Sequence, residues 1–281
     1  FLDHPNRSKL RGIQFKISSK IPIGRDSTRP IFVLMLIERI LYRIRGLKPM
    51  KAMLLRVGVD KGTDNALAPI FQDGSFEYIP ISEGCLTNET KTFKNTIGRK
   101  GRTLSSYLPR SVENRIMHFD PEFETFTYGD PTSKKTYLLK LDRGDLLVFY
   151  AGLIPYKNNN YDSGLYIIGY FTVERVIDFA QLSDHEIDKC YQLYPNNAHL
   201  KRNYVEFELA LVVGSKDKSM LLERGILISK TKCDVLGRPY YAVSDEMEDL
   251  LGIKGSIQRS VPPRFIKGDE KTKNLKDILG F

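Results

Sequence analysis

Four carboxylates and one histidine crowd into one stretch of fourteen residues, His118–Pro131, near the middle of the chain. They are His118, Asp120, Glu122, Glu124 and Asp130. In an extended chain, side chains two residues apart share a face, so Asp120, Glu122 and Glu124 would point the same way. A row of like charges repels itself unless water, a cation or hydrogen-bond donors meet it. The stretch predicts either a solvated polar edge over an aromatic core or a ligand site.

A second group of acidic side chains follows the first expected strand, Met53–Val59, whose apolar run is typical of a buried strand. It comprises Asp60, Asp64, Asp73 and Glu77. The last two belong to an expected hairpin with an Asp-Gly turn. If this hairpin pairs with His118–Pro131, the two acidic groups meet, and carboxylate oxygens are the ligands that Mg²⁺ prefers. The alternative is that Asp73 only stabilises its own turn.

Sequence motifs of several enzyme classes are absent. The chain has no P-loop, no Rossmann glycine pattern, no H-E-x-x-H, no G-x-S-x-G and no zinc deaminase signature. Its four histidines are far apart, at positions 4, 118, 185 and 199, which predicts against a histidine-rich metal site. Three distant cysteines indicate neither a disulfide framework nor a thiolate zinc site, and they favour the cytoplasm.

A set of basic and aromatic residues is suited to nucleotide recognition. Arginine binds phosphate or guanine in a bidentate manner, and tyrosine stacks on an unpaired base. The candidate nucleotide-binding residues are Asp60, Tyr150, His199, Arg202, Arg259 and Arg264. The alternative is that the arginines pair with acidic residues and that the tyrosines belong to the core.

The positive charge of the chain is confined to its N-terminal part. Residues 1–52 contain 12 Lys or Arg and 3 Asp or Glu, whereas the remaining residues contain 31 of each class. The bulk charge of the main part therefore does not indicate nucleic-acid binding. We expect residues 1–49 to be a basic extension that is not native or not part of the domain. Its apolar run, residues 31–37, is too short to span a bilayer, so no membrane partner is expected.

Hydrophobic patterning predicts an α+β fold with one domain over residues 50–265. Strands are expected at 53–59, 135–141, 146–151, 165–177 with a bulge at Gly169, and 205–213. Helices are expected after the Ser183 capping box and at 245–251, with a helical turn at 219–224. Residues 84–117 read as a mobile or functional loop, and residues 266–281 as a charged tail that frays. The sheet is expected to be mainly antiparallel, with a barrel-like (PUA-like) form as one possibility.

The chain resembles the nucleotide modification associated domain of the third type over about residues 53–265. The segments that carry the resemblance are Leu55–Asp60, Pro69–Phe71, Asp73–Pro80, His118–Pro131, Gly144–Gly152, Tyr166–Phe171, Asn197–Arg202 and Gln258–Arg264. The resemblance implies association with systems that modify DNA bases in prokaryotes or phages, with an unassigned reaction. The middle third also resembles PUA- and EVE-type barrels, which read modified or unpaired bases.

Three hypotheses for function follow. The first is a nucleotide- or nucleic-acid-handling protein of DNA base modification, whose catalytic form uses His118 as acid or base. In that form Asp120, Glu122 and Asp130 are metal or hydroxyl ligands, with Mg²⁺ as the possible cofactor. The second is a non-catalytic reader of bases that uses Tyr150 and the arginines. The third is a scaffold for base-modification enzymes.

Overall fold

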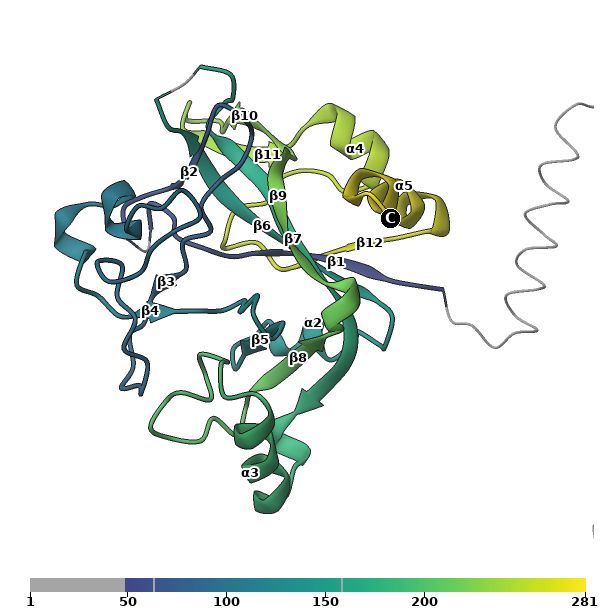
Figure 1. Ribbon diagram of the computed structural model, residues 1–281. Helices are drawn as coiled ribbons and strands as arrows, with labels where there is room; N and C mark the ends of the chain where they lie inside the picture. The colour runs from purple at the N-terminus through teal and green to yellow at the C-terminus, as the bar shows by residue number, and fades with distance from the viewer. Residues whose placement is uncertain (1–48, 63, 158) are drawn as a thin grey trace, which may run out of the picture. The chain divides into compact units, whose positions relative to one another are not determined.

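The computed structural model describes residues 49–281 apart from Thr63 and Asn158 (Figure 1). The expected N-terminal extension and its apolar run lie outside the described residues, except for position 49. Within the described part of the chain, no helix has the length and apolar character needed to cross a membrane.

The architecture is α+β, built on a mixed sheet of eight strands in the order β12-β1-β6-β7-β8-β5, with β2 beside β6 and β9 beside β7. The strands of this sheet are β1 (Ala52–Arg56), β2 (Ala68–Ile70), β5 (Thr127–Asp130), β6 (Leu146–Pro155), β7 (Gly164–Asp178), β8 (Ala210–Gly214), β9 (Met220–Leu227) and β12 (Arg264–Ile266). Two small antiparallel sheets join β3 (Ile81–Ser82) to β4 (Met117–His118) and β10 (Ser229–Cys233) to β11 (Pro239–Val243).

The expected antiparallel character is confirmed for most strand pairs, but β1 and β2 pair with β6 in parallel. The expected barrel is wrong. The order runs from β12 to β5 as an open sheet, and these two end strands do not pair with each other. Alternating strands separated by turns look alike in open sheets and barrels, so the sequence pattern does not decide closure. The PUA likeness stays a prediction.

The hairpin of β6 and β7 forms the centre of the sheet. Residues 146–153 of β6 are all buried, as are residues 164–171 of β7, which explains their nearly continuous apolar sequence. The register between the strands shifts beside Gly169. A Cβ atom at this glycine would lie 2.7 Å from the Met220 carbonyl oxygen, so the close approach of β9 requires glycine here. The predicted bulge is confirmed.

In the described part of the chain, four α-helices lie around the sheet: α2 (Lys135–Leu138), α3 (Asp184–Leu193), α4 (Asp245–Leu251) and α5 (Asp269–Leu279). The capping box of α3 and the Ser244 cap of α4 are confirmed, and α4 ends at Gly252 with φ +68°. Short 3₁₀ turns are η1 (Leu104–Tyr107), η2 (Arg110–Val112), η3 (Phe179–Gln181) and η4 (Lys216–Lys218). Figure 1 shows α4 and α5 together, and α3 near β8 at the other end of the sheet.

Three local expectations are wrong. Residues 135–141 begin with the helix α2 and form no strand, because a short apolar run with one buried face fits either element. The helical turn expected at 219–224 is replaced by a strand, because residues 220–224 belong to β9, whose pairing with β7 outweighs their helical propensity. Residues 269–279 form α5 instead of a frayed tail, because Leu275 and Leu279 are buried and the charged residues lie on the outer side.

The long segment between β3 and β4 is irregular, as expected, but carboxylates fix its backbone. Glu77, which is 1% exposed, accepts hydrogen bonds from the backbone N–H groups of Arg99 and Lys100. Glu89 accepts from the two N–H groups that follow it. Phe93 is fully buried and anchors the middle of the segment in the core. These contacts place β4, and with it His118, against the rest of the fold.

Candidate metal centre

The stretch His118–Pro131 turns back on itself between β4 and β5 instead of extending. The Glu122 carboxylate accepts hydrogen bonds from the backbone N–H groups of Glu124 and Thr125, and Phe126 has φ +61°. Phe123, at the tip of the turn, packs edge-on against three aromatic rings of the core. The expectation that Asp120, Glu122 and Glu124 share one face is therefore wrong, because a side chain caps its own turn.

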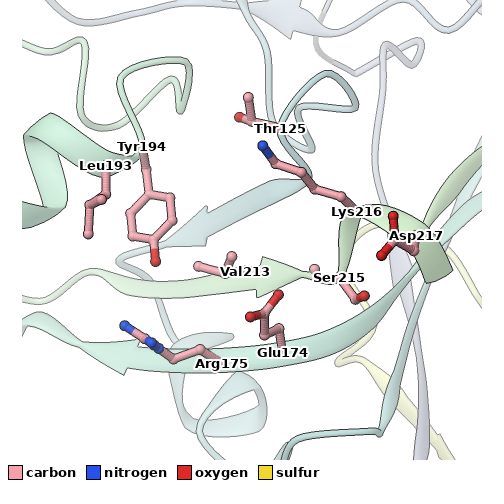
Figure 2. Close-up of a pocket in the computed structure, with 10 residues that line it drawn as sticks. Thr125, Glu174, Arg175, Leu193, Tyr194, Val213, Ser215, Lys216 and Asp217 are labelled. Atoms are coloured by element: carbon pink, nitrogen blue, oxygen red, sulfur yellow. The ribbon is translucent and has the colours of Figure 1, made fainter.

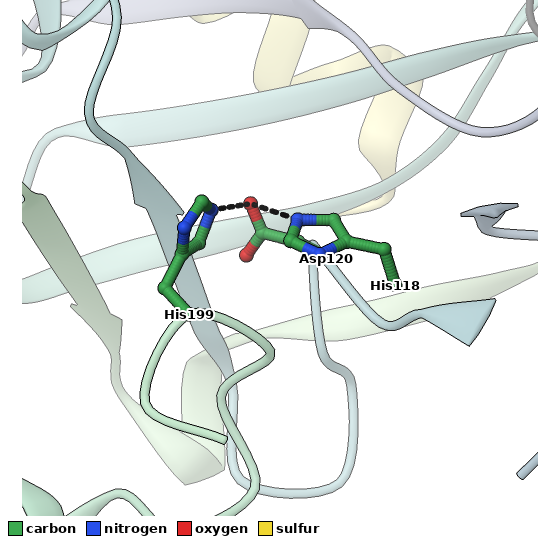
Figure 3. Close-up of side chains that lie close together, drawn as sticks. All are labelled: His118, Asp120 and His199. Atoms are coloured by element: carbon green, nitrogen blue, oxygen red, sulfur yellow. Dashed lines mark ion pairs between the residues drawn. The ribbon is translucent and has the colours of Figure 1, made fainter. Parts of the chain in front are cut away.

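The turn places Asp120 between two histidines that lie 81 positions apart in the sequence. His118 ends β4, and His199 lies between α3 and β8. Asp120 Oδ2 is 3.6 Å from His199 Nε2 and 4.0 Å from His118 Nε2, and Figure 3 shows both rings directed at this oxygen. One ligand atom of each residue lies within 4.8 Å of the others. All three side chains are at least nine-tenths buried.

The other nitrogen of each imidazole is held by a carboxylate. His118 Nδ1 lies 2.6 Å from Glu83 Oε2, and His199 Nδ1 lies 2.5 Å from Glu206 Oε2. Arg202 connects the two carboxylates, at 2.8 Å from Glu83 Oε1 and 2.7 Å from Glu206 Oε1. A hydrogen bond at Nδ1 fixes the tautomer and leaves Nε2 free as a metal ligand.

Backbone contacts fix the rest of the cluster. Asp120 Oδ1 accepts a hydrogen bond of 2.8 Å from the Gly129 N–H, which leaves Oδ2 facing the histidines. Asn197 is fully buried, donates to Thr127 in β5 and accepts from the backbone N–H of His199. A Cβ atom at Gly129 would lie 2.7 Å from His199 Cδ2. The glycine therefore provides the space that the imidazole occupies.

The pKa values show the strength of the field around the cluster. Burial disfavours the charged imidazole of His199, but Asp120 and Glu206 outweigh burial and raise its pKa to about 9. Burial likewise opposes ionisation of Glu83, but the hydrogen bonds from His118 and Arg202 hold the pKa of this carboxyl well below its usual range. Positive charge is therefore strongly favoured among these carboxylates.

The geometry suits a divalent transition metal better than Mg²⁺. Ligand atoms about 2.0–2.1 Å from tetrahedral zinc lie roughly 3.3 Å apart, so a separation of at most 4.8 Å needs a closure of about 1.5 Å or less. Two imidazoles and one carboxylate are ligands of zinc and of non-haem iron, whereas Mg²⁺ prefers oxygen atoms alone. The sequence-based argument against a histidine metal site considered only spacing along the chain.

The other predicted carboxylates lie outside this cluster. Glu122 caps the turn, and the Glu124 side chain is 73% exposed. Asp130 accepts hydrogen bonds from Thr132 and Tyr128. The acidic group that follows β1 does not join them: its members bond to Arg259, Ser82, Ser75 and the backbone at residues 99 and 100. The described residues thus do not form the expected site of two acidic groups.

The predicted nucleotide-binding residues separate into two places. His199 and Arg202 belong to the cluster just described. The other four, Asp60, Tyr150, Arg259 and Arg264, lie around the end of β1. Tyr150 is 3% exposed and its hydroxyl donates to the Ile257 carbonyl, so no face of its ring is open for stacking on a base. The alternative that tyrosines serve the core fits this residue.

A surface pocket of about 460 Å³ lies elsewhere, between the end of α3 and strands β7 and β8. Figure 2 shows Arg175, Tyr194 and Lys216 along its walls. A more open hollow of about 610 Å³ is lined by residues around Phe71 and Lys100. Of the acidic residues considered above, Asp73 lines the second hollow, where it pairs with Lys100. Neither pocket gathers groups with the mutual geometry of the histidine cluster, so we assign no chemistry to them.

Sequence reasoning missed two members of the cluster, Glu83 and Glu206. Glu206 stands four residues after Arg202, a spacing that predicts an ion pair on a helical turn. Glu83 gives no local signal, because only the pairing of β3 with β4 brings it to His118. The histidines were each singled out, but for separate roles.

Comparison with known proteins identifies a family. The model of the family described as nucleotide modification associated domain 3 matches residues 51–246. No curated protein and no solved structure matches the chain.

Proposed function

Because the chain belongs to the family of nucleotide modification associated domain 3, we propose that it is a metal-dependent enzyme that modifies a nucleotide or a DNA base. The proposed ligands of the metal are His118, Asp120 and His199. The carrying observation is that these three donors converge on one point while carboxylates hold the outer nitrogens of both histidines.

Charge balance supports this assignment. Glu83, Asp120 and Glu206 contribute three negative charges, and Arg202 contributes one positive charge. With both imidazoles neutral, as metal ligation requires, the buried cluster has a net charge of −2. A divalent cation would neutralise this charge, whereas without a metal the proton on His199, whose pKa is raised to about 9, offsets part of it.

The three-ligand arrangement favours catalysis over a structural metal. Structural zinc sites use four protein ligands, whereas catalytic metals keep a position for water or substrate. The described residues supply three converging donors. A metal with an open position activates a bound molecule as a Lewis acid, and the chain would supply the fixed ligands and the buried surroundings. The reader hypothesis has less support, because Tyr150 is buried.

The proposal is tested by thermal unfolding of the full chain with Zn²⁺, Mn²⁺, Co²⁺ and Mg²⁺. A cation that accepts nitrogen ligands should raise the melting temperature, by the equivalent of about 2.7 kcal/mol at a hundredfold excess over its Kd. Mg²⁺ should have little effect. The His199→Gln variant should lose the shift, and the His185→Gln variant should keep it, because His185 is exposed on α3.

Incubation with nucleotides and short DNA, followed by mass spectrometry, tests the chemistry itself. A mass change that requires both the metal and His199 supports the enzyme. A metal shift of equal size in the His199→Gln variant, or no shift with any cation, would reject the site.

A further inference from the structure

A group of arginines lies at the end of β1, and none of its members is a proposed metal ligand. The register pairs Arg56 with Tyr150 of β6, and Arg264 of β12 with Leu54. Directly paired residues share a face, and so do residues two apart on a strand. Arg56, Arg264 and Tyr150 therefore lie on one face of the sheet. The loop that contains Ile257 covers this face, because it accepts the hydrogen bond of the Tyr150 hydroxyl.

Arg56 is a buried cation whose hydrogen-bonding capacity is only partly used. Its side chain belongs to a residue that is 7% exposed, and its Nε and Nη1 atoms have no hydrogen-bond acceptor in the described part of the protein. Burial and the neighbouring charge of Arg259 lower its pKa to about 10, so it remains charged at neutral pH. A Cβ atom at Gly152 would lie 2.7 Å from Nη2, so this glycine leaves room for the guanidinium.

The two neighbouring arginines do not neutralise this charge. Arg264 has a buried Nε without an acceptor, and it donates through Nη2 to the Ser256 carbonyl at 3.2 Å. Arg259 donates to Asp60 and to the Gly58 carbonyl. Asp60 is the carboxylate whose charge acts on Arg56. These three guanidinium groups and one carboxylate leave a net charge of +2.

A buried charge without a counter-charge is strongly unfavourable unless a ligand of opposite charge binds to it. We infer that Arg56, together with Arg259 and Arg264, binds the terminal phosphate of a free nucleotide. A phosphate monoester has nearly two negative charges at neutral pH, which matches the excess. Guanidinium groups donate hydrogen bonds to phosphate oxygens. The N–H groups of Arg56 and Arg264 that have no acceptor in the described residues are such donors.

The chemistry favours a terminal phosphate over a nucleic-acid backbone. A phosphodiester has one negative charge and would leave the buried group positive. Arg56 is almost fully buried, whereas the Arg259 side chain is 29% exposed and Arg264 is half-buried, so the group meets solvent at these two arginines. That the phosphate belongs to the substrate of the metal centre rests on the function proposed above.

The Tyr78 hydroxyl is influenced by charges of both groups. This buried hydroxyl has no hydrogen-bond partner in the described residues. Burial raises the pKa of Tyr78 well above its usual value, the charge of Asp120 raises it further, and the charge of Arg259 opposes the rise. Asp120 and Arg259 thus act on the same hydroxyl.

The test is calorimetric titration of the full chain with deoxynucleoside 5′-monophosphates, the corresponding nucleosides and inorganic phosphate. At least one monophosphate should bind about tenfold or more tightly than its nucleoside. Arg56→Met should remove this preference, and Arg143→Met, at an exposed arginine, should retain it. Arg56→Met should also leave the melting temperature of the unliganded chain unchanged or raised, because it removes an unpaired charge.

Three further binding measurements test the phosphate site. If Arg56→Met does not fold, an accompanying loss of phosphate binding in Arg264→Met supports the site, and unchanged binding overturns it. The second measurement compares a single-stranded oligonucleotide that has a 5′-phosphate with the same oligonucleotide without it. Weak binding of both supports the inference, because the site then prefers a free nucleotide. Tight binding of both overturns the inference. His199→Gln should still bind the monophosphate, so loss of the metal centre and loss of the phosphate site are distinguishable. Absence of binding to every phosphate compound overturns the inference.

Discussion

The histidine cluster and the arginine group are opposite solutions to buried charge. In the first, every side chain has a close partner: Glu83 and Glu206 hold the histidines, and Arg202 joins both carboxylates. In the second, Arg56 has free donors, and the neighbouring Arg259 has a charge of the same sign. With neutral imidazoles the histidine cluster has a net charge of −2, whereas the arginine group has a net charge of +2. The difference teaches that buried charge can be held ready for ligands of opposite sign.

The largest expected effect follows from removing one arginine from each region. Arg202→Met would leave Glu83 and Glu206 buried without their shared cation, so we expect the free energy of unfolding to fall by about 3–5 kcal/mol. Arg56→Met should not lower it, because two of the Arg56 donors have no acceptor among the described residues and the charge of Arg259 opposes that of Arg56. Urea unfolding of both variants at neutral pH, without added ligand, measures the contrast. Equal destabilisation by the two substitutions would contradict the distinction between the regions.

The next effect concerns the space beneath His199. Gly129→Ala would place a Cβ atom 2.7 Å from His199 Cδ2 and 2.9 Å from Leu209 Cδ1. We expect a destabilisation of about 1–3 kcal/mol, as for overpacking in a core, together with a weaker response to metal. The matched control is Gly84→Ala, because a Cβ atom at Gly84 has no neighbour within 4 Å. A normal metal response in Gly129→Ala would show that the imidazole position is not critical.

Part of this arrangement could be predicted from the sequence. The strands β6 and β7, the bulge at Gly169 and the two helix caps depend on local patterns, which the sequence displays directly. The sequence also indicates His118 and Asp120 as candidate site residues, because they lie in the stretch rich in carboxylates. The meeting of His118 with His199 could not be predicted, because it depends on β5 pairing with β8 and on the contacts of Asn197.

The same limit applies to charge. Arg56 reads as part of a buried apolar strand, and only its register with Tyr150 places its guanidinium beside other arginines. Likewise, a row of carboxylates at residues 120–124 suggested one face, but Glu122 bonds to its own backbone turn. Side chains that cap local turns interrupt the strand periodicity on which such expectations depend.

The smallest expected changes in stability come from substituting Glu122 and Glu124, the two carboxylates of the turn that are not proposed metal ligands. Glu122→Gln should lower the free energy of unfolding by about 1 kcal/mol, because a weaker acceptor replaces a charged one, and should leave the metal response intact. Glu124→Gln should change stability by less than about 0.5 kcal/mol, since the side chain is 73% exposed. Thermal unfolding with and without zinc measures both. Loss of the metal response in Glu124→Gln would place an additional ligand in the centre.

The most direct test of the metal assignment is anomalous X-ray scattering from a zinc-soaked crystal of the full chain. The account predicts one strong anomalous peak, about 2.0–2.2 Å from His118 Nε2, His199 Nε2 and a carboxylate oxygen of Asp120, with both Nδ1 atoms still held by Glu83 and Glu206. A crystal without a peak at this position, with Asp120 still facing two metal-free histidines, would contradict it.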